Sequence, residues 1–306
     1  MRAVSGALPE SPFRKAGAGP SLAATPNAPS LLARPRLHIS TSVSASDEPV
    51  FSVCTLMTDM EQYAAMKTSF IEHGFTPDRA EFLQIDNRRG NSLDAYRGLG
   101  RLLDEARGRY VILCHQDLLL LEDGAAELEA RLTALDRCDP DWAVAGNSGL
   151  TADMHHVLHI SDPHGENQVR GELPQRVQSL DENFLVVRRD SGIRPSEELS
   201  GFHLYGTDLC LQARRAGRSA WVIDFHLRHL SPGRMDESFY REQANFERIW
   251  GARVGRTEIV ATTCTRLILG NDLTARRLKL MRGIQRLPVI NGIVYRRYLA
   301  KQAAEA

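Results

Sequence analysis

Three polar side chains interrupt an apolar run near the middle of the sequence. Tyr110–Cys114 reads YVILC, His115, Gln116 and Asp117 follow, and residues 118–121 are four leucines. Polar groups between buried segments must be hydrogen-bonded, bound to a ligand or exposed in a cleft. A carboxylate beside an imidazole and an amide suits holding a divalent cation against a phosphate. Taken alone, the pattern favours an aspartate that only caps a strand or hydrogen-bonds inside, so the surrounding elements decide between the two.

Those elements predict an α/β fold. Apolar runs too short for free-standing helices alternate with helical apolar stripes, in the order β-α-β-α-β-α-β. The predicted strands are Val50–Met57, Glu81–Ile85, Tyr110–Cys114 and Trp142–Ala145. Thr58 and Glu61 resemble a capping box that opens the first helix. This order implies a mostly parallel sheet with helices on both faces, in which the carboxyl ends of the strands face the ligand crevice.

The second half of the chain is less regular. Residues 147–175 read as a polar loop with four histidines, namely His155, His156, His159 and His164. Their spacing matches no closed zinc pattern, so we expect a loop that faces substrate or solvent. Further strands are expected at Val177–Leu180, Phe184–Val187 and Ala220–Ile223, a helix at Asp208–Ala216, and mostly helix from Phe239 onward.

Composition sets the broad class. The 306 residues carry no net charge, 42% are hydrophobic and 25% are charged, which indicates a globular protein and argues against a nucleic-acid binder. The five cysteines are scattered and form no CxxC, which favours buried thiols in a reducing, cytoplasmic compartment. Residues 1–48 are rich in Pro, Ala, Ser and Gly, so we expect a disordered tail. The folded domain is expected at residues 49–238.

Residues 239–306 are expected to form a helical C-terminal extension that is basic towards its end. Within residues 261–306, nine Arg and Lys residues stand against two acids, with apolar residues between the charges. One interpretation is a helical arm that packs on the domain and keeps a solvated outer face. The other is contact with an anionic membrane surface, as a peripheral protein at the inner membrane face that does not span the bilayer. No apolar run approaches the roughly 20 residues that a spanning helix needs.

With these elements in place, residues 50–235 resemble the family 2-like glycosyltransferases of the GT-A fold, a Rossmann-like fold of nucleotide-diphospho-sugar transferases. The similarity is greatest to the branch often labelled streptomycin biosynthesis protein StrF-like. Five segments carry it in family order: VFSVCTLMTD, LQIDN, NSLDAYRGLGRLLDEARGRYVILCHQD, SLDENFLVVRRD with FHLYGTDLCLQARRAG, and WVIDFHLRHLSPG. The family's Asp-x-Asp metal motif stands here as His115-Gln116-Asp117, so its first aspartate is replaced.

The resemblance implies a metal-dependent, inverting glycosyltransferase that moves a sugar from a nucleotide-sugar donor to a glycan, lipid-linked or small-molecule acceptor. It implies Mn²⁺ or Mg²⁺ as the cofactor, held by Asp117, His229 and His115. It assigns donor contacts to Thr55, Asp86, Asn87, Asp94 and Gln116. The catalytic base is expected to be Asp208, with Asp181 and Glu182 as the alternative carboxylates, because the family's acidic pair is Tyr205-Gly206 in this chain.

Two other classes compete with this interpretation. A nucleotide-sugar-binding protein without turnover would explain the replaced aspartate and Gly206. A nucleotidyltransferase usually needs a Gly-rich phosphate loop after the first strand, and TLMTDMEQ provides none. Release of nucleoside diphosphate from a donor in the presence of Mn²⁺ separates an active transferase from a binding protein.

Overall fold

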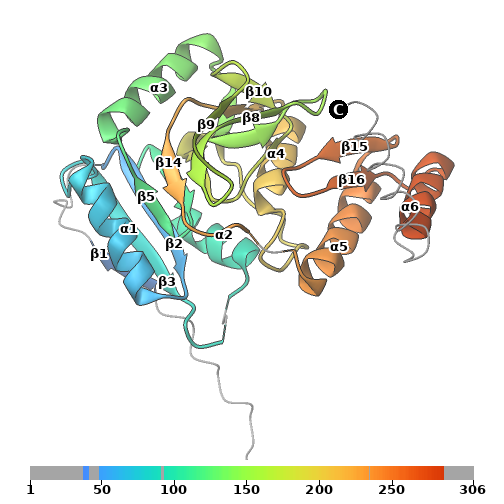
Figure 1. Cartoon of the computed structure of the whole chain (residues 1–306), viewed down its shortest axis with the longest axis horizontal. Helices are drawn as coiled ribbons and strands as arrows, with labels where there is room; N and C mark the ends of the chain where they lie inside the picture. The colour runs from blue at the N-terminus through green and yellow to red at the C-terminus, as the bar shows by residue number, and fades with distance from the viewer. Residues whose placement is uncertain (1–36, 41–47, 91–92, 234, 286–306) are drawn as a thin grey trace, which may run out of the picture. The chain divides into compact units, whose positions relative to one another are not determined.

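The computed structural model describes residues 37–40, 48–90, 93–233 and 235–285, with only the backbone described for residues 37–40, 284 and 285 (Figure 1). The first half contains β1 (Leu37–Ser40), β2 (Phe51–Met57), α1 (Met60–Glu72), β3 (Ala80–Asp86), α2 (Ala95–Glu105), β4 (Tyr110–Cys114), β5 (Leu118–Leu120), α3 (Ala125–Cys138), β6 (Trp142–Gly146) and β7 (Ser148–Leu150). The second half contains β8 (His156–Asp162), β9 (Gly165–Arg170), β10 (Gln175–Val177), β11 (Ser179–Leu180), β12 (Phe184–Arg188), α4 (Tyr205–Arg215), β13 (Ser219–Val222), β14 (Leu227–His229), α5 (Glu237–Arg253), β15 (Glu258–Ala261), β16 (Arg266–Leu269) and α6 (Leu273–Gln285).

The main sheet has eight strands in the order β1-β3-β2-β4-β12-β6-β13-β10. The predicted α/β, Rossmann-like class is confirmed, since β3, β2 and β4 pair in parallel and are joined through helices. The expectation of a mostly parallel sheet is wrong. Strand β12 lies antiparallel between β4 and β6, and β1 and β10 are also antiparallel to their neighbours, so the sheet is mixed.

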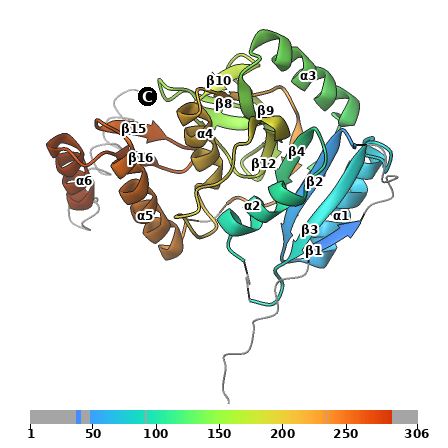
Figure 2. The same ribbon diagram turned by 180° about the vertical axis from the view of Figure 1, so that it is seen from behind.

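Helices cover both faces of this sheet, as predicted (Figures 1 and 2). On one face, Met66 and Phe70 of α1 and Leu132 of α3 belong to a single apolar cluster with strand residues such as Phe51. On the other face, α2 and α4 contribute to a second cluster with the opposite side chains of the same strands. The period-2 alternation of the strands therefore feeds two cores, one on each side.

The ends of α1 show how local chemistry fixes a turn near the crevice. The predicted cap, Thr58, is one residue early: Asp59 is the N-cap, and its carboxylate accepts from the backbone N–H groups of Glu61 and Gln62. Aspartate is at least as good an N-cap as threonine. At the other end the chain reverses at Gly74, whose φ of +87° favours glycine.

A second sheet occupies the segment that was expected to be a polar loop. Strands β11, β7, β8, β14 and β5 follow one another, and β9 pairs with β8. Residues 147–175 are therefore largely strand, and the loop prediction is wrong. In this sheet β14 pairs antiparallel with β5, with His229 opposite Leu118. This pairing places the end of β14 next to the polar residues that follow β4.

The C-terminal extension is only partly helical. Helices α5 and α6 flank a hairpin of β15 and β16, which the expectation of a mostly helical extension did not include. The expected boundary between residues 238 and 239 falls within α5, and the described residues on its two sides belong to one compact unit. In the described part of the chain, no helix has both the length and the hydropathy that crossing a bilayer requires.

Only one observation bears on the predicted disordered N-terminal tail, and it goes against the prediction for four residues. Residues 37–40 form β1, which pairs with β3, so this part of the predicted disordered tail is a strand. The remainder of residues 1–47, and residues 286–306 of the basic tail, lie outside the described residues. All five cysteines are free thiols. Cys54, Cys114 and Cys210 are buried as the apolar context predicted, whereas Cys138 and Cys264 are exposed, so the prediction of buried thiols is wrong for these two.

Candidate active site

Three side chains that could hold a metal ion, together the metal-ligand group, converge at the carboxyl end of β4. His115 and Asp117 follow this strand directly, and His229 ends β14. One ligand atom from each side chain lies within 4.8 Å of the other two. His115 Nδ1 is 3.4 Å from His229 Nε2, and Asp117 Oδ1 is 3.5 Å from His229 Nε2 and 3.9 Å from His115 Nδ1. Among the described residues, this is the one such group of His, Cys, Asp or Glu side chains.

The main chain around the group explains its geometry. Antiparallel pairing of β5 with β14 sets His229 opposite Leu118, one residue after Asp117. The backbone N–H of Leu230 then donates to the carbonyl oxygen of Asp117 at 3.0 Å. Two segments more than a hundred residues apart in the sequence are thus held in register by main-chain hydrogen bonds, which fix side-chain positions better than a free loop does.

The electrostatics keep the Asp117 carboxyl ionised. Burial acts to raise its pKa, but the hydrogen bond and charge of His229, together with His115 and Ser231, outweigh burial and hold the pKa at about 2. The pKa of His115 is lowered, first by burial and then by the neighbouring His229. Near neutral pH the group therefore offers a carboxylate and an imidazole free of its second proton, which are the protonation states that ligate metal ions.

Tyr205 orients the ring of His115. The phenol oxygen of Tyr205, at the start of α4, is 2.8 Å from His115 Nε2 and donates to the backbone carbonyl oxygen of Glu182 at 3.2 Å. If the phenol gives its one proton to the Glu182 carbonyl oxygen, it accepts from the Nε2–H of His115. The lone pair of His115 then lies on Nδ1, which is the atom that faces Asp117 and His229.

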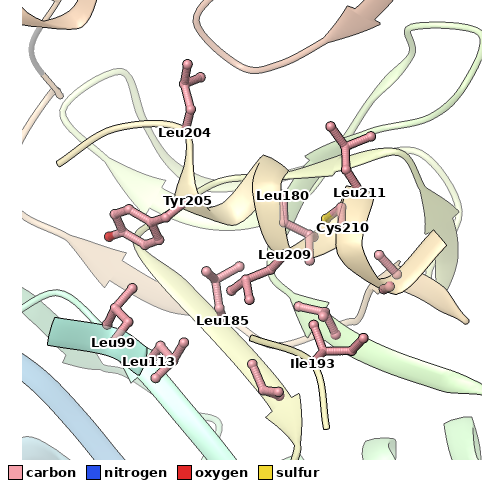
Figure 3. Packing of buried hydrophobic residues seen from close by; sticks show 14 of the residues in the cluster. Leu99, Leu113, Leu180, Leu185, Ile193, Leu204, Tyr205, Leu209, Cys210 and Leu211 are labelled. Atoms are coloured by element: carbon pink, nitrogen blue, oxygen red, sulfur yellow. The ribbon is translucent and has the colours of Figure 1, made fainter. Parts of the chain in front are cut away.

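A cavity of about 320 Å³ adjoins these residues. Its wall is formed by Leu56, Thr58, Asn87, Ala95, Leu99, Leu113, Cys114, His115, Gln116, Asp117, Phe202 and Tyr205. These residues come from the carboxyl ends of β2, β3 and β4 and the residues that follow them, from α2, from the segment before α4 and from the first residue of α4. Figure 3 shows Tyr205 directed from α4 toward Leu99 and Leu113. A mostly apolar wall with a few polar groups at one end is typical of a small-molecule site.

The structure separates the five predicted donor-contact residues. Asn87 and Gln116 line the cavity. Thr55, Asp86 and Asp94 do not. Thr55 is buried, with its hydroxyl 3.5 Å from Cys114 Sγ, Asp86 pairs with Arg88, and Asp94 caps α2.

Even the two cavity-lining residues have internal partners. The side chain of Asn87 exchanges two hydrogen bonds with the backbone of Leu93, at 2.8 and 3.2 Å. The Gln116 amide oxygen accepts from the backbone N–H groups of Thr58 and Asp59, at 2.7 and 2.9 Å. Gln116 therefore braces the turn between β2 and α1 against the metal-ligand group, and its side chain serves the shape of the cavity.

The predicted base, Asp208, is placed differently from the expectation. Its side chain is fully buried within α4 and does not line the cavity. The carboxylate accepts from the backbone N–H and hydroxyl of Ser196, at 2.6 and 2.7 Å, and from Trp250 Nε1 at 2.7 Å. Burial raises the pKa of Asp208 to about 6, against the opposing effect of those hydrogen bonds. In this arrangement Asp208 joins three segments of the fold and does not face the crevice.

The alternative carboxylates belong to the segment whose backbone pairs with His115, and neither of them lines the cavity. Asp181 and Glu182 immediately precede the β12 segment, and the backbone N–H of His115 donates to the carbonyl oxygen of Asn183 at 2.9 Å. Both Asp181 oxygens are occupied, one by Asn183 and the other by the Thr263 hydroxyl. These hydrogen bonds outweigh the effect of burial and keep the pKa of Asp181 below its ordinary value.

The side chain of Glu182 packs against the first turn of α4. Burial, and next the charge of Asp181, raise the pKa of Glu182 well above its ordinary value, against the opposing effect of the backbone N–H groups of Leu204 and Gly206. The backbone also explains why residue 206 is a glycine. A Cβ there would lie 2.7 Å from the carbonyl oxygen of Leu180 and 3.3 Å from Glu182 Cγ. The resembled glycosyltransferases have an acid at the position of Gly206. Here the side chain of Glu182 packs against this position, which leaves no room for one.

A curated protein of Fuscovulum blasticum, described as "ATP synthase subunits region ORF 6", is 44% identical over 223 residues, covering 69% of this chain and 90% of that protein. The chain belongs to the same family as this protein. The description of the ORF 6 protein gives no activity, so the function of the family has to come from the chemistry of the site. No protein-family model matches the sequence.

Solved structures that superpose on this member of the ORF 6 family include several glycosyltransferases. They are GalNAc-T7 with UDP, GalNAc and Mn²⁺ (TM-score 0.40, 8% identity, 68% of this chain and 51% of that one) and the mannosyltransferase PcManGT of Pyrobaculum calidifontis with GDP-Man and Mn²⁺ (0.43, 10%, 71% and 68%). TarS of S. aureus with UDP-GlcNAc aligns at 0.40 and 14%, over 63% and 64%. The matched part of the chain thus spans only about half the length of GalNAc-T7. At these scores the superpositions establish no relationship by themselves.

Sequence reasoning gave no cavity role to two aromatic residues of the site. Tyr205 and Phe202 line the cavity; the aromatic residues near the predicted helix start were the available signal. The segment that carries Phe202 is held by α5, since the carboxylate of Glu242 accepts from the backbone N–H groups of Phe202 and His203, both at 2.9 Å. The four histidines of residues 155–164 join no metal-ligand group among the described residues.

Proposed function

We propose that this protein is a divalent-metal-dependent glycosyltransferase of the GT-A kind, which moves a sugar from a nucleoside-diphosphate sugar to an acceptor hydroxyl. The observation that carries the proposal is the convergence of His115, Asp117 and His229 on one point at the rim of the 320 Å³ cavity. The motif order that resembles the family 2-like, StrF-like branch supports the same activity. A cation placed at that rim would lie where a diphosphate must lie if its nucleoside enters the cavity.

The three side chains fit a cation. Two ligands that each lie about 2.1 Å from one ion are about 3.0 to 3.5 Å apart at angles of about 90 to 110°. The separations of 3.4, 3.5 and 3.9 Å meet or slightly exceed this range, so small side-chain movements would complete the site. Two imidazoles and one carboxylate favour Mn²⁺ over Mg²⁺, because Mg²⁺ takes oxygen ligands. When bound, the cation would neutralise charge on the leaving diphosphate.

The chain's own groups have distinct tasks in this proposal. The apolar wall, with Leu56 and Leu99, would exclude water around the nucleoside, and Asn87 would border it. Asp117 and His229 would fix the diphosphate end through the cation. Tyr205 would keep the Nδ1 lone pair of His115 directed at the same point.

The base is assigned to Glu182. Asp208 is buried with three hydrogen-bond donors on its carboxylate, and both oxygens of Asp181 are occupied. Glu182 is linked to the metal-ligand group through the phenol of Tyr205, which contacts both the Glu182 carbonyl oxygen and His115 Nε2, and its raised pKa makes its ionised form a stronger base. It would take the acceptor proton as the hydroxyl oxygen bonds to the anomeric carbon and the diphosphate leaves with its electron pair. Attack opposite the leaving group inverts the anomeric centre.

A second candidate is a nucleotide-sugar-binding protein of the same fold without turnover. Gly206 in place of an acid, and His115 in place of the first aspartate of the metal motif, favour it. The two functions share the donor site and differ only in the chemical step. Binding with Mn²⁺ but no release of nucleoside diphosphate, with any acceptor tried, would establish the binding protein.

The test combines donor binding and turnover in the purified full chain. UDP-, GDP- and dTDP-sugars are screened by thermal shift with and without Mn²⁺, followed by an assay for released nucleoside diphosphate. At a donor concentration of about 100 times Kd, binding stabilises the fold by about 2.7 kcal/mol and should raise Tm by about 5 °C or more. If no donor raises Tm in a Mn²⁺-dependent way, the proposed function is wrong.

A further inference from the structure

Helix α6 exposes large apolar side chains that the described part of the fold does not cover. The exposed fractions of Leu273, Leu280 and Met281 are 70%, 65% and 56%, which are the largest for any large hydrophobic side chain that the structure describes. The helix lies beyond α5 and the β15–β16 hairpin (Figures 1 and 2). Large exposed apolar side chains gathered on one helix mark an interaction surface more often than an ordinary solvated one.

The inner face of α6 is held by charged and small residues. Ala275 is fully buried, and Lys279 Nζ donates to the carbonyl oxygen of Gly270 at 3.4 Å. Two guanidinium nitrogens of Arg282 donate to the carboxylate of Glu247 on α5, at 2.6 and 2.7 Å. An amphipathic helix packed on a domain normally turns its apolar side inward. Here Lys279 and Arg282 bind the domain through their polar contacts and turn this side of α6 inward. The large apolar residues of α6 therefore point out into solvent.

The outer face carries positive charge as well as apolar groups. At the helical period, Leu273, Arg276, Arg277 and Leu280 form one stripe, and Met281 borders it. Arg276 and Arg277 are exposed, and α6 contains no acidic residue. A surface that is both apolar and cationic is complementary to the interface of an anionic bilayer, which offers an apolar layer below negative headgroups.

The same charge argues against a second copy as the occupant. A symmetric contact between two α6 faces would bring Arg276 and Arg277 towards the same residues of the partner copy, without an acid on this helix to pair with them. Like charges that face each other across an interface disfavour it. The charge pattern therefore selects an anionic surface.

We propose that the outer face of α6 binds the surface of membranes that contain anionic lipids, with Leu273, Leu280 and Met281 inserted among the headgroups and Arg276 and Arg277 against the negative charge. The site lies apart from the candidate active site and does not depend on the activity proposed for it. The sequence after α6 continues the pattern, since residues 286–306 hold four basic residues and one acidic residue among apolar ones.

The test is flotation of the full chain with vesicles of phosphatidylcholine alone or with about one quarter phosphatidylglycerol, at about 0.05 and 0.5 M salt. The wild-type chain should float with the anionic vesicles at low salt only. Each basic residue near the surface contributes roughly a fivefold factor, so Arg276→Gln/Arg277→Gln should lower the partition coefficient about twentyfold or more. Leu280→Glu/Met281→Glu should lower it at least as much, because it removes apolar contact and adds like charge.

Matched variants control for overall charge and hydropathy. Arg137→Gln/Arg170→Gln removes two exposed cations from other parts of the chain, and Val169→Glu changes an apolar residue that is 55% exposed on β9. Both should float like the wild-type chain, and circular dichroism verifies that all variants fold. Flotation of the α6 variants equal to that of the wild type, or no wild-type flotation, would overturn the proposal. So would a dimer that Leu280→Glu/Met281→Glu dissociates, because the face would then be covered by a second copy.

Discussion

Replacing Asp208 should destabilise the fold before it affects any chemistry. In Asp208→Ala, the backbone N–H and hydroxyl of Ser196 and the indole N–H of Trp250 all lose their acceptor in a buried site. A buried donor left unsatisfied costs about 1 to 3 kcal/mol, so the loss of the acceptor for these donors together should cost at least about 3 kcal/mol. We therefore expect Asp208→Ala to lower the free energy of unfolding by at least this amount at low pH.

The size of the loss should depend on pH. The pKa of Asp208 is about 6 in the folded chain and 3.8 in the reference state, so the folded state binds this proton more tightly. The stabilising contribution is fully present below pH 3.8 and is lost as pH rises through about 6. At about 1.4 kcal/mol for each pH unit, the difference amounts to about 3 kcal/mol. The stability advantage of the wild-type chain over Asp208→Asn, which cannot ionise, should therefore shrink between pH 4 and pH 7.

Urea denaturation at several pH values, followed by tryptophan fluorescence, measures both effects. Asp190→Ala is the matched control, since it removes an exposed carboxylate that pairs with Arg188 and should cost no more than about 1 kcal/mol. An unfolding free energy of Asp208→Ala equal to that of the control, with sugar transfer abolished, would refute the structural role and return the base to Asp208.

Three further substitutions test the site and the segment that borders it. Tyr205→Phe removes the partner of His115 Nε2 and should weaken Mn²⁺ binding about 10- to 100-fold in equilibrium titrations while Tm changes little. Unchanged Mn²⁺ affinity would show that the imidazole of His115 is oriented without the phenol. Glu182→Gln should lower kcat about 10²- to 10⁴-fold with donor affinity retained. Transfer by the wild-type chain should increase with pH, because the raised pKa keeps Glu182 protonated at lower pH. Full activity of the variant would pass the role of the base to Asp181. Gly201→Ala places a Cβ 2.1 Å from the Glu242 carboxyl carbon at a φ of +115° and should lower the free energy of unfolding by more than about 1 kcal/mol. Gly255→Ala, with open space around it, is the control and should change that free energy by no more than about 0.5 kcal/mol. Equal stabilities of the two variants would contradict the close approach of Glu242 to Gly201.

The parts of the fold that depend on local pattern could be predicted from the sequence. Apolar runs located β2, β3, β4 and β6, and helical stripes located α1, α2 and α3, because burial on one or both faces leaves a period in the residues themselves. The metal-ligand group was also predicted, since the family resemblance linked His229 to Asp117. Pairing of β14 with β5 supplies the geometry that the resemblance only implied.

The parts that depend on distant partners could not be predicted. Strand β12 has the same apolar pattern whether it pairs parallel or antiparallel, and its place between β4 and β6 follows only from the three-dimensional arrangement. Asp208 looks like an ordinary helix-start acid, and its burial is decided by Ser196 and by Trp250, which is 42 residues away. Strands β8 and β9 contain His, Asn and Gln in place of a strong apolar alternation, so they read as a loop.

Titration of Mn²⁺ into the purified full chain, followed by electron paramagnetic resonance of the free ion, tests the central claim most directly. The account predicts one saturable site per chain, lost in Asp117→Ala and in His229→Ala while both variants keep the wild-type circular dichroism spectrum. His155→Ala, which alters an exposed histidine outside the metal-ligand group, should bind Mn²⁺ like the wild-type chain. Saturable binding that persists unchanged in Asp117→Ala and His229→Ala would show that these residues do not form the metal site.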